Sequence, residues 1–115
     1  MFRFEGLEVW RRAATIGAEM MDVAQELDRS RKYKVAEQLR GAALSISNNI
    51  AEGSGSFSRK DFRVFLNYSH RSVFETANIL MLCQRSGWIS KTHAESHLKE
   101  LEEIAKMIIG FSRSL

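Results

Sequence analysis

The chain has 115 residues, of which 44% are hydrophobic and 27% are charged, a balance that excludes an intrinsically disordered protein. It contains one cysteine and no proline, which excludes an internal disulfide and a cysteine-based zinc site and favours long helices. No apolar run reaches the roughly 20 residues of a membrane span, and the charged first residues exclude a signal peptide. We therefore expect a single cytoplasmic domain, residues 1–115, with a mildly basic formal net charge of +3.

Two amphipathic helices are predicted in the first half of the chain. Apolar residues recur at steps of three and four over residues 7–27, until the sequence DRSRK interrupts the pattern. A second such segment covers residues 33–52, and Gly53 is expected to adopt a left-handed conformation just after it. The predicted buried positions are Val9, Ala13, Ile16, Met20, Val23 and Leu27 in the first helix, and Val35, Ala36, Leu39, Ala42, Ala43, Ile46 and Ile50 in the second.

Two further helices are predicted in the second half. Ser58 is the expected N-cap of a helix over residues 59–86, with Asp61 completing an acidic variant of the capping box. Gly87 and Trp88 are expected to end this helix, and Ser90 to cap a last helix that continues to the end of the chain. The 59–86 helix carries two apolar stripes and therefore has to be covered on two sides. The stripes are Phe62, Leu66, Ser69, Val73, Thr76, Leu80, Cys83 and Phe65, Tyr68, Ser72, Glu75, Ile79, Leu82.

The short connections between these helices make consecutive helices antiparallel. The predicted fold is therefore all-α, a single-domain antiparallel up-down-up-down four-helix bundle. The stretch from Gly41 to Ala51 has no charged residue and many small ones, so the 33–52 helix has almost no face suited to water. We expect self-association through the second and third helices; the alternative is a second helix whose outer face is merely weakly polar.

Isolated charges in these neutral stretches are predicted to have structural roles. Arg40 is the only charged residue in positions 38–51, and Glu75 is the only one in positions 72–84. A buried carboxylate without a partner is strongly destabilising, so we predict an Arg40–Glu75 ion pair, within one chain or across a subunit contact.

Glu52 stands at the end of the second helix, where the helix dipole disfavours an anion. The cations at the start of the next helix, Arg59, Lys60 and Arg63, are expected to offset this cost. Asn49, one turn earlier, is expected to hold the backbone of the turn through its amide.

Three segments carry a family resemblance: FEGLEVWRRA (4–13), QLRGAALSISNNIAEG (38–53) and FRVFLNYSHRSVFE (62–75). They resemble the four-helix-bundle family encoded in bacterial 23S rRNA intervening sequences, also labelled the S23 ribosomal protein family. The resemblance covers essentially the whole chain, and its most specific part is the run Asn49 to Gly53. The chain departs from the family pattern at Ser47, where the family has proline, at Asn48, and at His70-Arg71, where it has Arg-Gly.

The resemblance implies a left-handed antiparallel bundle that assembles as a homopentamer and has no established enzymatic activity. It also implies a relation to accessory proteins of diversity-generating retroelements, which form similar basic pentamers that bind nucleic acid and a reverse transcriptase. Structural polar roles in the family motif are implied for Arg40, Asn49, Glu52, Gly53, Ser72 and Glu75.

Two groups of cations are candidate nucleic-acid-binding sites. Four lie at the turn between the first two helices, and three begin the third helix at the opposite end of the bundle, beside Phe57 as a candidate stacking residue. Repeated around a ring, such groups bind phosphate backbones without reading sequence. The residues are Arg29, Arg31, Lys32 and Lys34, and Arg59, Lys60 and Arg63.

A scaffold that docks a protein partner, without nucleic acid, is the alternative function. A metalloenzyme is disfavoured, because a di-iron bundle needs Glu-x-x-His pairs and none is present. His93 and His97 are one turn apart, but at the start of an exposed helix we expect them to be solvated. His70, Ser72 and Cys83 are scattered along the third helix without an oxyanion-hole loop. We expect no catalytic residues, no metal, no cofactor and no membrane contact.

Overall fold

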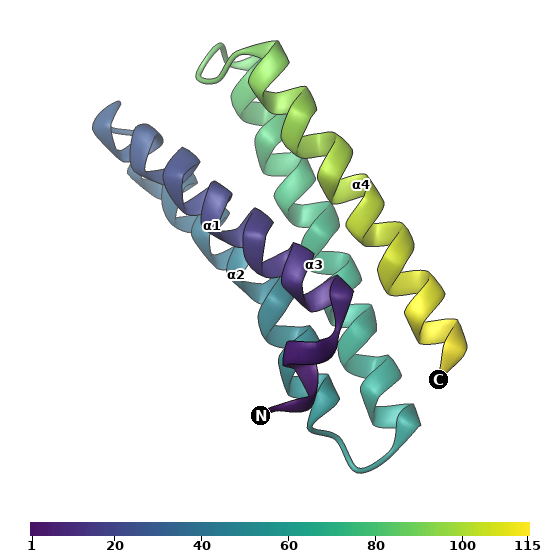
Figure 1. Cartoon of the computed structure of the whole chain (residues 1–115). Helices are drawn as coiled ribbons and strands as arrows, with labels where there is room; N and C mark the ends of the chain where they lie inside the picture. The colour runs from purple at the N-terminus through teal and green to yellow at the C-terminus, as the bar shows by residue number, and fades with distance from the viewer.

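Four long helices make up nearly the whole chain (Figure 1). The computed structural model describes all of residues 1–115 and begins with a short 3-10 helix, η1 (Arg3–Gly6). The long helices are α1 (Glu8–Arg29), α2 (Tyr33–Ser54), α3 (Arg59–Arg85) and α4 (Lys91–Ser114), so each predicted helix is present within two residues of its expected ends. None of them has both the length and the apolar character that crossing a membrane requires.

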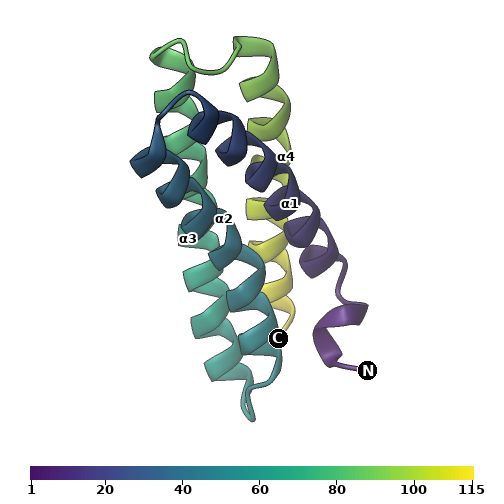
Figure 2. The same ribbon diagram turned by 90° about the vertical axis from the view of Figure 1, so that its left-hand side faces the viewer.

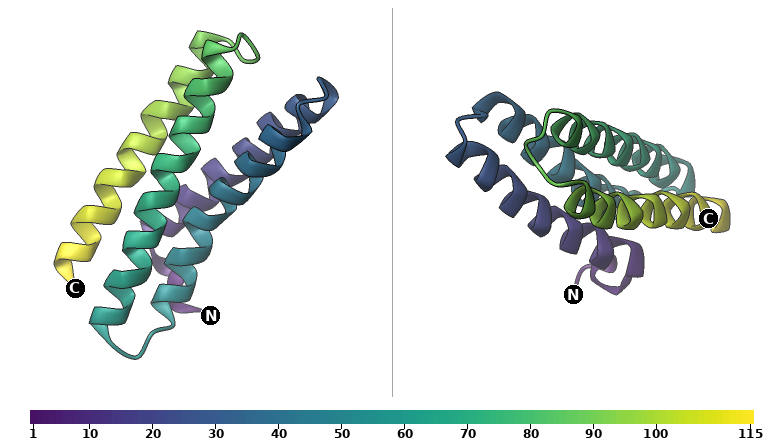
Figure 3. Two further views of the ribbon diagram at one scale, coloured as in Figure 1. Left: turned by 180° about the vertical axis from the view of Figure 1, so that it is seen from behind. Right: turned by 90° about the horizontal axis from the view of Figure 1, so that it is seen from above.

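Consecutive helices are antiparallel, which confirms the predicted up-down-up-down bundle. The α1–α2 and α3–α4 turns lie at one end, and the α2–α3 loop lies at the other (Figure 2). Toward the end with the two turns, the α1–α2 hairpin diverges from the α3–α4 hairpin (Figure 1 and Figure 3). Because α2 packs extensively on both α1 and α3 while α1 and α4 touch over a short stretch, the α2–α3 contact holds the two hairpins together.

One ion pair reinforces the short contact between α1 and α4. Arg12 donates from Nε and Nη2 to the two carboxylate oxygens of Glu100, at 2.9 and 2.5 Å, in a bidentate arrangement. This hydrogen bonding to Glu100 raises the pKa of Arg12 above its ordinary value. Planar pairs of this kind fix orientation as well as distance, so the pair sets how α4 lies on α1.

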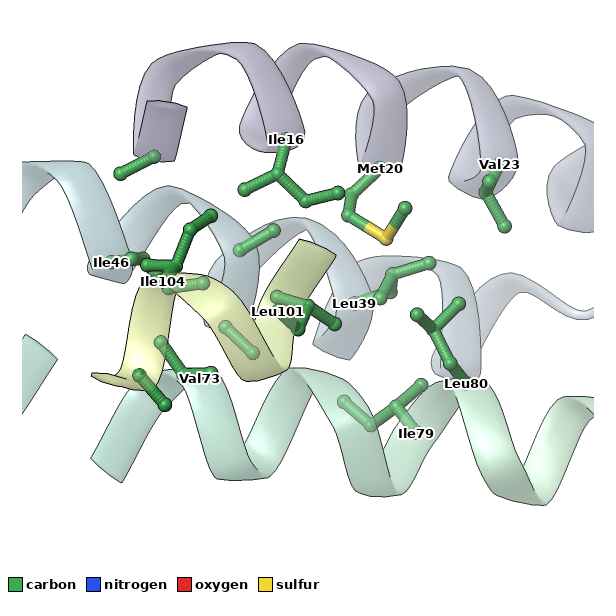
Figure 4. Close-up of a cluster of buried hydrophobic side chains, with 14 of the residues drawn as sticks. Ile16, Met20, Val23, Leu39, Ile46, Val73, Ile79, Leu80, Leu101 and Ile104 are labelled. Atoms are coloured by element: carbon green, nitrogen blue, oxygen red, sulfur yellow. The ribbon is translucent and has the colours of Figure 1, made fainter. Parts of the chain in front are cut away.

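The hydrophobic core fills the space between the four helices (Figure 4). All predicted core positions of α1 are buried, and so are those of α2 except the half-buried Val35. Every residue of the first α3 stripe is buried, including the polar Ser69 and Thr76. Each buried aliphatic side chain contributes roughly 1.5–3 kcal/mol, which makes this core the main source of stability. Figure 4 labels Ile16, Met20, Val23, Leu39, Ile46, Val73, Ile79, Leu80, Leu101 and Ile104.

The second stripe of α3 is only partly covered within the chain. Ser72 and Ile79 are buried, whereas Tyr68 is 45% exposed, Leu82 is 54% exposed and Glu75 faces solvent. The prediction that α3 is covered on two sides is therefore met within one chain for only part of its length. The remainder is an apolar and polar strip without an intramolecular partner.

Both predicted N-caps are confirmed. The Asp61 backbone N–H donates to Ser58 Oγ at 3.0 Å, and the His93 backbone N–H donates to Ser90 Oγ at 3.1 Å. A serine at this position satisfies one of the free N–H groups of the first turn, which stabilises a helix by about 1 kcal/mol.

The predicted end of α3 is confirmed as well. Gly87 has a φ of +76°, a left-handed conformation that glycine adopts without steric cost. Its N–H donates to the Gln84 carbonyl oxygen at 3.0 Å, and the Trp88 N–H donates to that of Cys83 at 2.9 Å. This pair of bonds is the Schellman motif, which closes the helix before the α3–α4 turn.

The predicted role of Gly53 is wrong. Helix α2 continues through Ser54, and Gly53 is buried inside its last turn. A Cβ at this position would lie 2.7 Å from Phe65 Cβ and 2.8 Å from Phe62 Cδ1 of α3. Glycine is therefore required here because two helices approach closely, and not because the backbone leaves the helix.

This contact predicts that Gly53→Ala destabilises the protein by about 1–3 kcal/mol, since the added methyl overpacks the α2–α3 interface. Gly41→Ala, elsewhere in α2, is the matched control, because a Cβ there meets nothing within 4 Å. Its expected effect is a stabilisation of up to about 1 kcal/mol from helix propensity. Urea unfolding followed by circular dichroism measures both, and equal effects of the two substitutions would contradict the packing role.

Candidate functional site

The two predicted groups of cations lie at opposite ends of the bundle (Figure 1). The α1–α2 cluster surrounds the turn between these helices, and the α3 cluster occupies the first turns of α3. Their members are Arg29, Arg31, Lys32 and Lys34 in the α1–α2 cluster, and Arg59, Lys60 and Arg63 in the α3 cluster.

The backbone of the α1–α2 turn is a Schellman motif with arginine in the place of glycine. Arg31 has a φ of +62°, its N–H donates to the Asp28 carbonyl oxygen at 2.9 Å, and the Lys32 N–H donates to that of Leu27 at 2.8 Å. A non-glycine residue in this conformation costs about 1 kcal/mol or more. The chain thus holds an exposed guanidinium at the tip of the bundle at a local cost in stability.

The side chains of the α1–α2 cluster differ in their contacts. Arg29 forms an ion pair with Glu26 on the same helix. Lys32 Nζ lies 4.8 Å from the centre of the Trp88 ring, a cation–π contact that links this turn to the α3–α4 turn. Arg31 and Lys34 are exposed and have no carboxylate partner, so they are the cations of this cluster most available to a ligand.

The α3 cluster lies where the dipole of its own helix disfavours positive charge. Its three cations are exposed and lie near the N-terminus of α3, where positive charge is disfavoured by about 0.3–1 kcal/mol per residue. Asp61 in the same turn is the only acidic residue there. The neighbouring Phe57 is fully exposed. Exposed cations in an unfavourable position indicate a surface suited to an anionic partner.

Pairing across the whole molecule leaves an excess of free positive charge. Six of the 17 lysines and arginines have an aspartate or glutamate oxygen within 4.0 Å, and eleven do not. Of the 14 carboxylates, eight are paired with a lysine or arginine and six are not. The unpaired surface is therefore more basic than the net charge of +3 indicates.

Several residues of the family motif line an open depression of about 420 Å³, the α2–α3 polar face. Ser72 Oγ lies 2.8 Å from Ser45 Oγ, and Asn49 Nδ2 donates to the carbonyl and hydroxyl oxygens of Ser45 at 2.8 and 2.9 Å. The face joins α2 to α3 through uncharged groups and leaves its two charged members without ion pairs. It is formed by Ser45 and Asn49 of α2 with Tyr68, Arg71, Ser72 and Glu75 of α3.

The predicted Arg40–Glu75 ion pair is wrong within the chain. Arg40 Nη1 donates to Asp28 Oδ2 at 2.9 Å and Nη2 donates to Glu37 Oε2 at 3.5 Å, and the hydrogen bond to Asp28 raises the pKa of Arg40. Ser45, which touches α3, follows Arg40 by five residues and lies about 140° around the helix. Arg40 therefore faces the end of α1, and only the version of the pair across subunits stays a prediction.

Two further structural roles are not observed as predicted. Glu52 is exposed and has no lysine or arginine within 4.0 Å, so the α3 cluster does not pair with it directly. Asn49 binds Ser45 one turn back in α2 instead of the loop backbone. Both side chains therefore lie on the surface of α2 before the loop.

His97 is buried, which overturns the expectation that it is solvated. It lies on the core side of α4, its Nε2 has no hydrogen-bond partner, and its Nδ1 is 3.8 Å from Glu19 Oε1 of α1. Burial lowers the pKa of His97, and the neighbouring His93 acts in the same direction. The nearby Glu19 opposes this shift but does not outweigh the loss of hydration.

The other reactive side chains are not assembled into a site. Cys83 is buried in the core, and burial raises the pKa of its thiol, which disfavours the nucleophilic thiolate. Ser72 takes part in the α2–α3 polar face, whereas His70 lies on the side of α3 next to α4. No group of three or more His, Cys, Asp or Glu side chains is placed to hold a metal ion.

Residues 5–110 match the family model described as 23S rRNA-intervening sequence protein. The chain belongs to this family. It is also similar to a crystal structure, at 1.70 Å, of a protein with unknown function from the S23 ribosomal protein family of Bacteroides thetaiotaomicron. The two share 26% identity with a TM-score of 0.87, over 90% of this chain and 97% of the other. A search of curated proteins finds no match.

Membership of the 23S rRNA-intervening sequence protein family confirms the resemblance drawn from the three sequence segments and agrees with the four-helix fold. The solved relative is described as a protein of unknown function. The comparison therefore identifies the fold, and the biochemical role has to be inferred from the surface of the protein.

Sequence reasoning missed several residues that the fold brings to the candidate surfaces. Ser45 and Arg71 join the α2–α3 polar face, and Arg113 of α4 comes to lie beside Arg63 of α3. The 68, 71, 72, 75 spacing on α3 was the available signal for the first group, because residues three and four apart share a helix face. No local signal marks Arg113, because its neighbour is on another helix.

The burial of His97 predicts a stability that falls as the pH is lowered. Its pKa is depressed in the folded state, so the unfolded chain binds the proton more readily, and stability is lost as the pH drops below about 6.5. His97→Leu is expected to flatten this dependence and to raise the free energy of unfolding near pH 5.5 by about 1 kcal/mol, because an unsatisfied polar group is removed.

Urea unfolding at pH values from about 7.5 to 5.5 measures the effect of His97→Leu against the wild type. His70→Gln is the matched control, since His70 is outside the α1–α4 contact and its replacement is expected to leave the pH dependence in place. A His97→Leu protein with the full wild-type slope would show that another group is responsible.

Proposed function

We propose that this protein is a non-enzymatic oligomer, a homopentamer assembled through α2 and α3, that binds RNA or DNA through repeated basic surfaces. The observation that carries the proposal is the set of eleven lysines and arginines without an aspartate or glutamate partner. Free cations attract the phosphate backbone and release its condensed counterions, which favours binding without base-specific contacts.

The uncovered side of the α2–α3 pair supports assembly. Leu44 of α2 is 48% exposed, and Tyr68 and Leu82 of α3 are exposed to a similar degree. Burial of apolar side chains drives association, and the α2–α3 polar face beside them offers hydrogen-bonding groups for orientation. Residues 41–51, which carry no charge, place no repulsive group in such an interface.

Assembly would strengthen binding to a polyanion by multiplication. Five copies of a chain with a formal charge of +3 carry about +15, and each end cluster recurs five times around the ring. A ring of this kind contacts many phosphates at once, so weak single contacts combine into useful affinity.

A scaffold that docks a protein partner is the second candidate function, and one observation favours it. A mainly apolar groove of about 350 Å³ lies between α3 and α4, with Phe74 62% exposed and Met81 48% exposed on its edge. Exposed apolar grooves mark interaction surfaces. The salt dependence of binding separates the two functions, because apolar burial responds weakly to ionic strength.

The assembly predicts that Leu44→Glu converts the oligomer to smaller species, since a charge enters a neutral interface. Phe74→Glu is the matched control, because Phe74 is also an exposed apolar residue but lies on the α4 side of α3. Light scattering coupled to size-exclusion chromatography measures both masses at micromolar concentration. A wild-type mass of one subunit would refute assembly, and loss of the oligomer in Phe74→Glu alone would place the interface elsewhere.

Nucleic-acid binding predicts that a labelled structured RNA binds with a Kd of about 10 µM or tighter at low salt and weakens steeply between about 50 and 200 mM salt. The triple charge reversal of Arg31, Lys32 and Lys34 to glutamate is expected to abolish this binding. Fluorescence anisotropy at two salt concentrations measures it.

Reversal of Lys91, Lys99 and Lys106 on α4 to glutamate is the control with the same change in net charge. It is expected to weaken binding much less, because these lysines are outside both end clusters. Equal losses in the two triple variants would indicate a response to net charge alone, and absence of wild-type binding at low salt would refute the nucleic-acid function.

A further inference from the structure

A groove between α3 and α4 gathers hydrogen-bond donors from two helices. It has a volume of about 280 Å³ and lies near the C-terminal end of α4. Its polar lining consists of Arg63, Asn67 and His70 from α3 and Ser112 and Arg113 from α4, and apolar side chains that include Leu66 and Ile108 form its base. We name it the α3–α4 donor groove.

The chemistry of this lining is one-sided. Each of the five polar side chains carries at least one N–H or O–H donor, and no carboxylate is among the lining residues. Arg113 forms no ion pair, and Arg63 contacts only the main-chain oxygen of Leu115, so the two guanidinium groups at this depression have no aspartate or glutamate partner. Such a lining suits an anionic ligand and disfavours a cation.

Two features hold these donors in place. Arg63 Nη1 donates to the main-chain oxygen of Leu115, the last of the 115 residues, at 3.1 Å, which keeps its side chain directed across the gap toward the end of α4. His70 packs against Phe74, with ring centres 5.0 Å apart. Because positioned donors lose little conformational freedom on binding, the groove is partly organised for its ligand.

The groove also continues the α3 cluster. Arg59, Arg63, Asn67 and His70 follow one another at spacings of three and four residues and therefore share one face of α3. The face spans about 16 Å along the helix, long enough to contact more than one phosphate of a nucleic-acid strand.

We propose that the α3–α4 donor groove is a phosphate-binding site that receives a backbone phosphodiester of the nucleic acid, with Arg63 and Arg113 as its principal ligands. The proposal rests on the nucleic-acid function proposed above. Guanidinium groups match phosphate oxygens through paired, charge-assisted hydrogen bonds, and Asn67, His70 and Ser112 supply further donors around the anion. The C-terminal dipole of α4 opposes an anion, but it is a partial charge against two full ones.

The test compares Arg113→Gln with Lys106→Gln, a change of an exposed cation of α4 that is paired with Glu102 and Glu103 and lies outside the groove and both end clusters. Binding of a fluorescein-labelled single-stranded RNA is followed by anisotropy over a salt series. Arg113→Gln is expected to weaken binding several-fold and to lower the slope of log K against log salt by about 0.7, the loss of one phosphate contact. Lys106→Gln is expected to change neither, and circular dichroism checks that both variants stay folded.

A second measurement tests phosphate binding in the α3–α4 donor groove independently of nucleic-acid binding. Inorganic phosphate is titrated into the wild-type protein at low salt while the ring protons of His70 and His93 are followed by NMR. Saturable shifts of His70 alone are expected, and they are lost in the Arg63→Gln, Arg113→Gln double variant.

The outcomes differ for the two proposals. RNA binding that Arg113→Gln and Lys106→Gln reduce equally would overturn the groove and leave the nucleic-acid function standing. If the wild type binds no RNA, the nucleic-acid function fails, and the His70 shifts then decide whether the groove binds phosphate. Shifts that do not saturate, or that His93 shows equally, would overturn the groove.

Discussion

The close contact between α2 and α3 is the constraint on which the rest of the structure depends. The two hairpins meet mainly there, because α1 and α4 share only a short contact. Near the loop, Gly53 leaves no space for a side chain beside Phe62 and Phe65. Further along, the buried hydroxyl of Ser69 donates to the Ile46 carbonyl oxygen of α2 at 2.7 Å. Approach at this distance requires short side chains, which explains why α2 is rich in glycine, alanine and serine.

This contact is made mainly by uncharged side chains. The charged side chains outside it are of two kinds. Some connect helices: Arg12 binds Glu100 across the α1–α4 contact, and Arg40 binds Asp28 at the end of α1. These partly buried pairs have a structural explanation. Exposed cations without a carboxylate partner, such as Arg31, Lys34 and Arg113, have none, since exposed charges without partners contribute little to folding. These cations therefore point to a functional surface at the ends and edges of the bundle and not in its centre.

Periodicity in the sequence was sufficient for the helices and the core, because a buried face repeats every three to four residues and turn residues mark its ends. It failed where a decision depended on which side of a helix a residue faces or on what packs against it. Arg40 and Glu75 are at nearby levels of the bundle but face different neighbours, and Gly53 has the residue type of a helix end without being one. The burial of His97 could have been predicted from the sequence, since it lies three residues after Ala94 and four before Leu101 on the apolar face of α4.

The candidate site was less accessible from the sequence, for a physical reason. Cations that are neighbours in the chain, such as Arg29 and Lys32, spread around a turn and are partly occupied by Glu26 and Trp88. Arg63 and Arg113 are far apart in the chain, and only the packing of α4 on α3 directs both into one groove. That groove shares no residue with the α2–α3 polar face. Assembly through the α2–α3 polar face would cover Arg71 but would leave Arg63 and Arg113 free in every subunit.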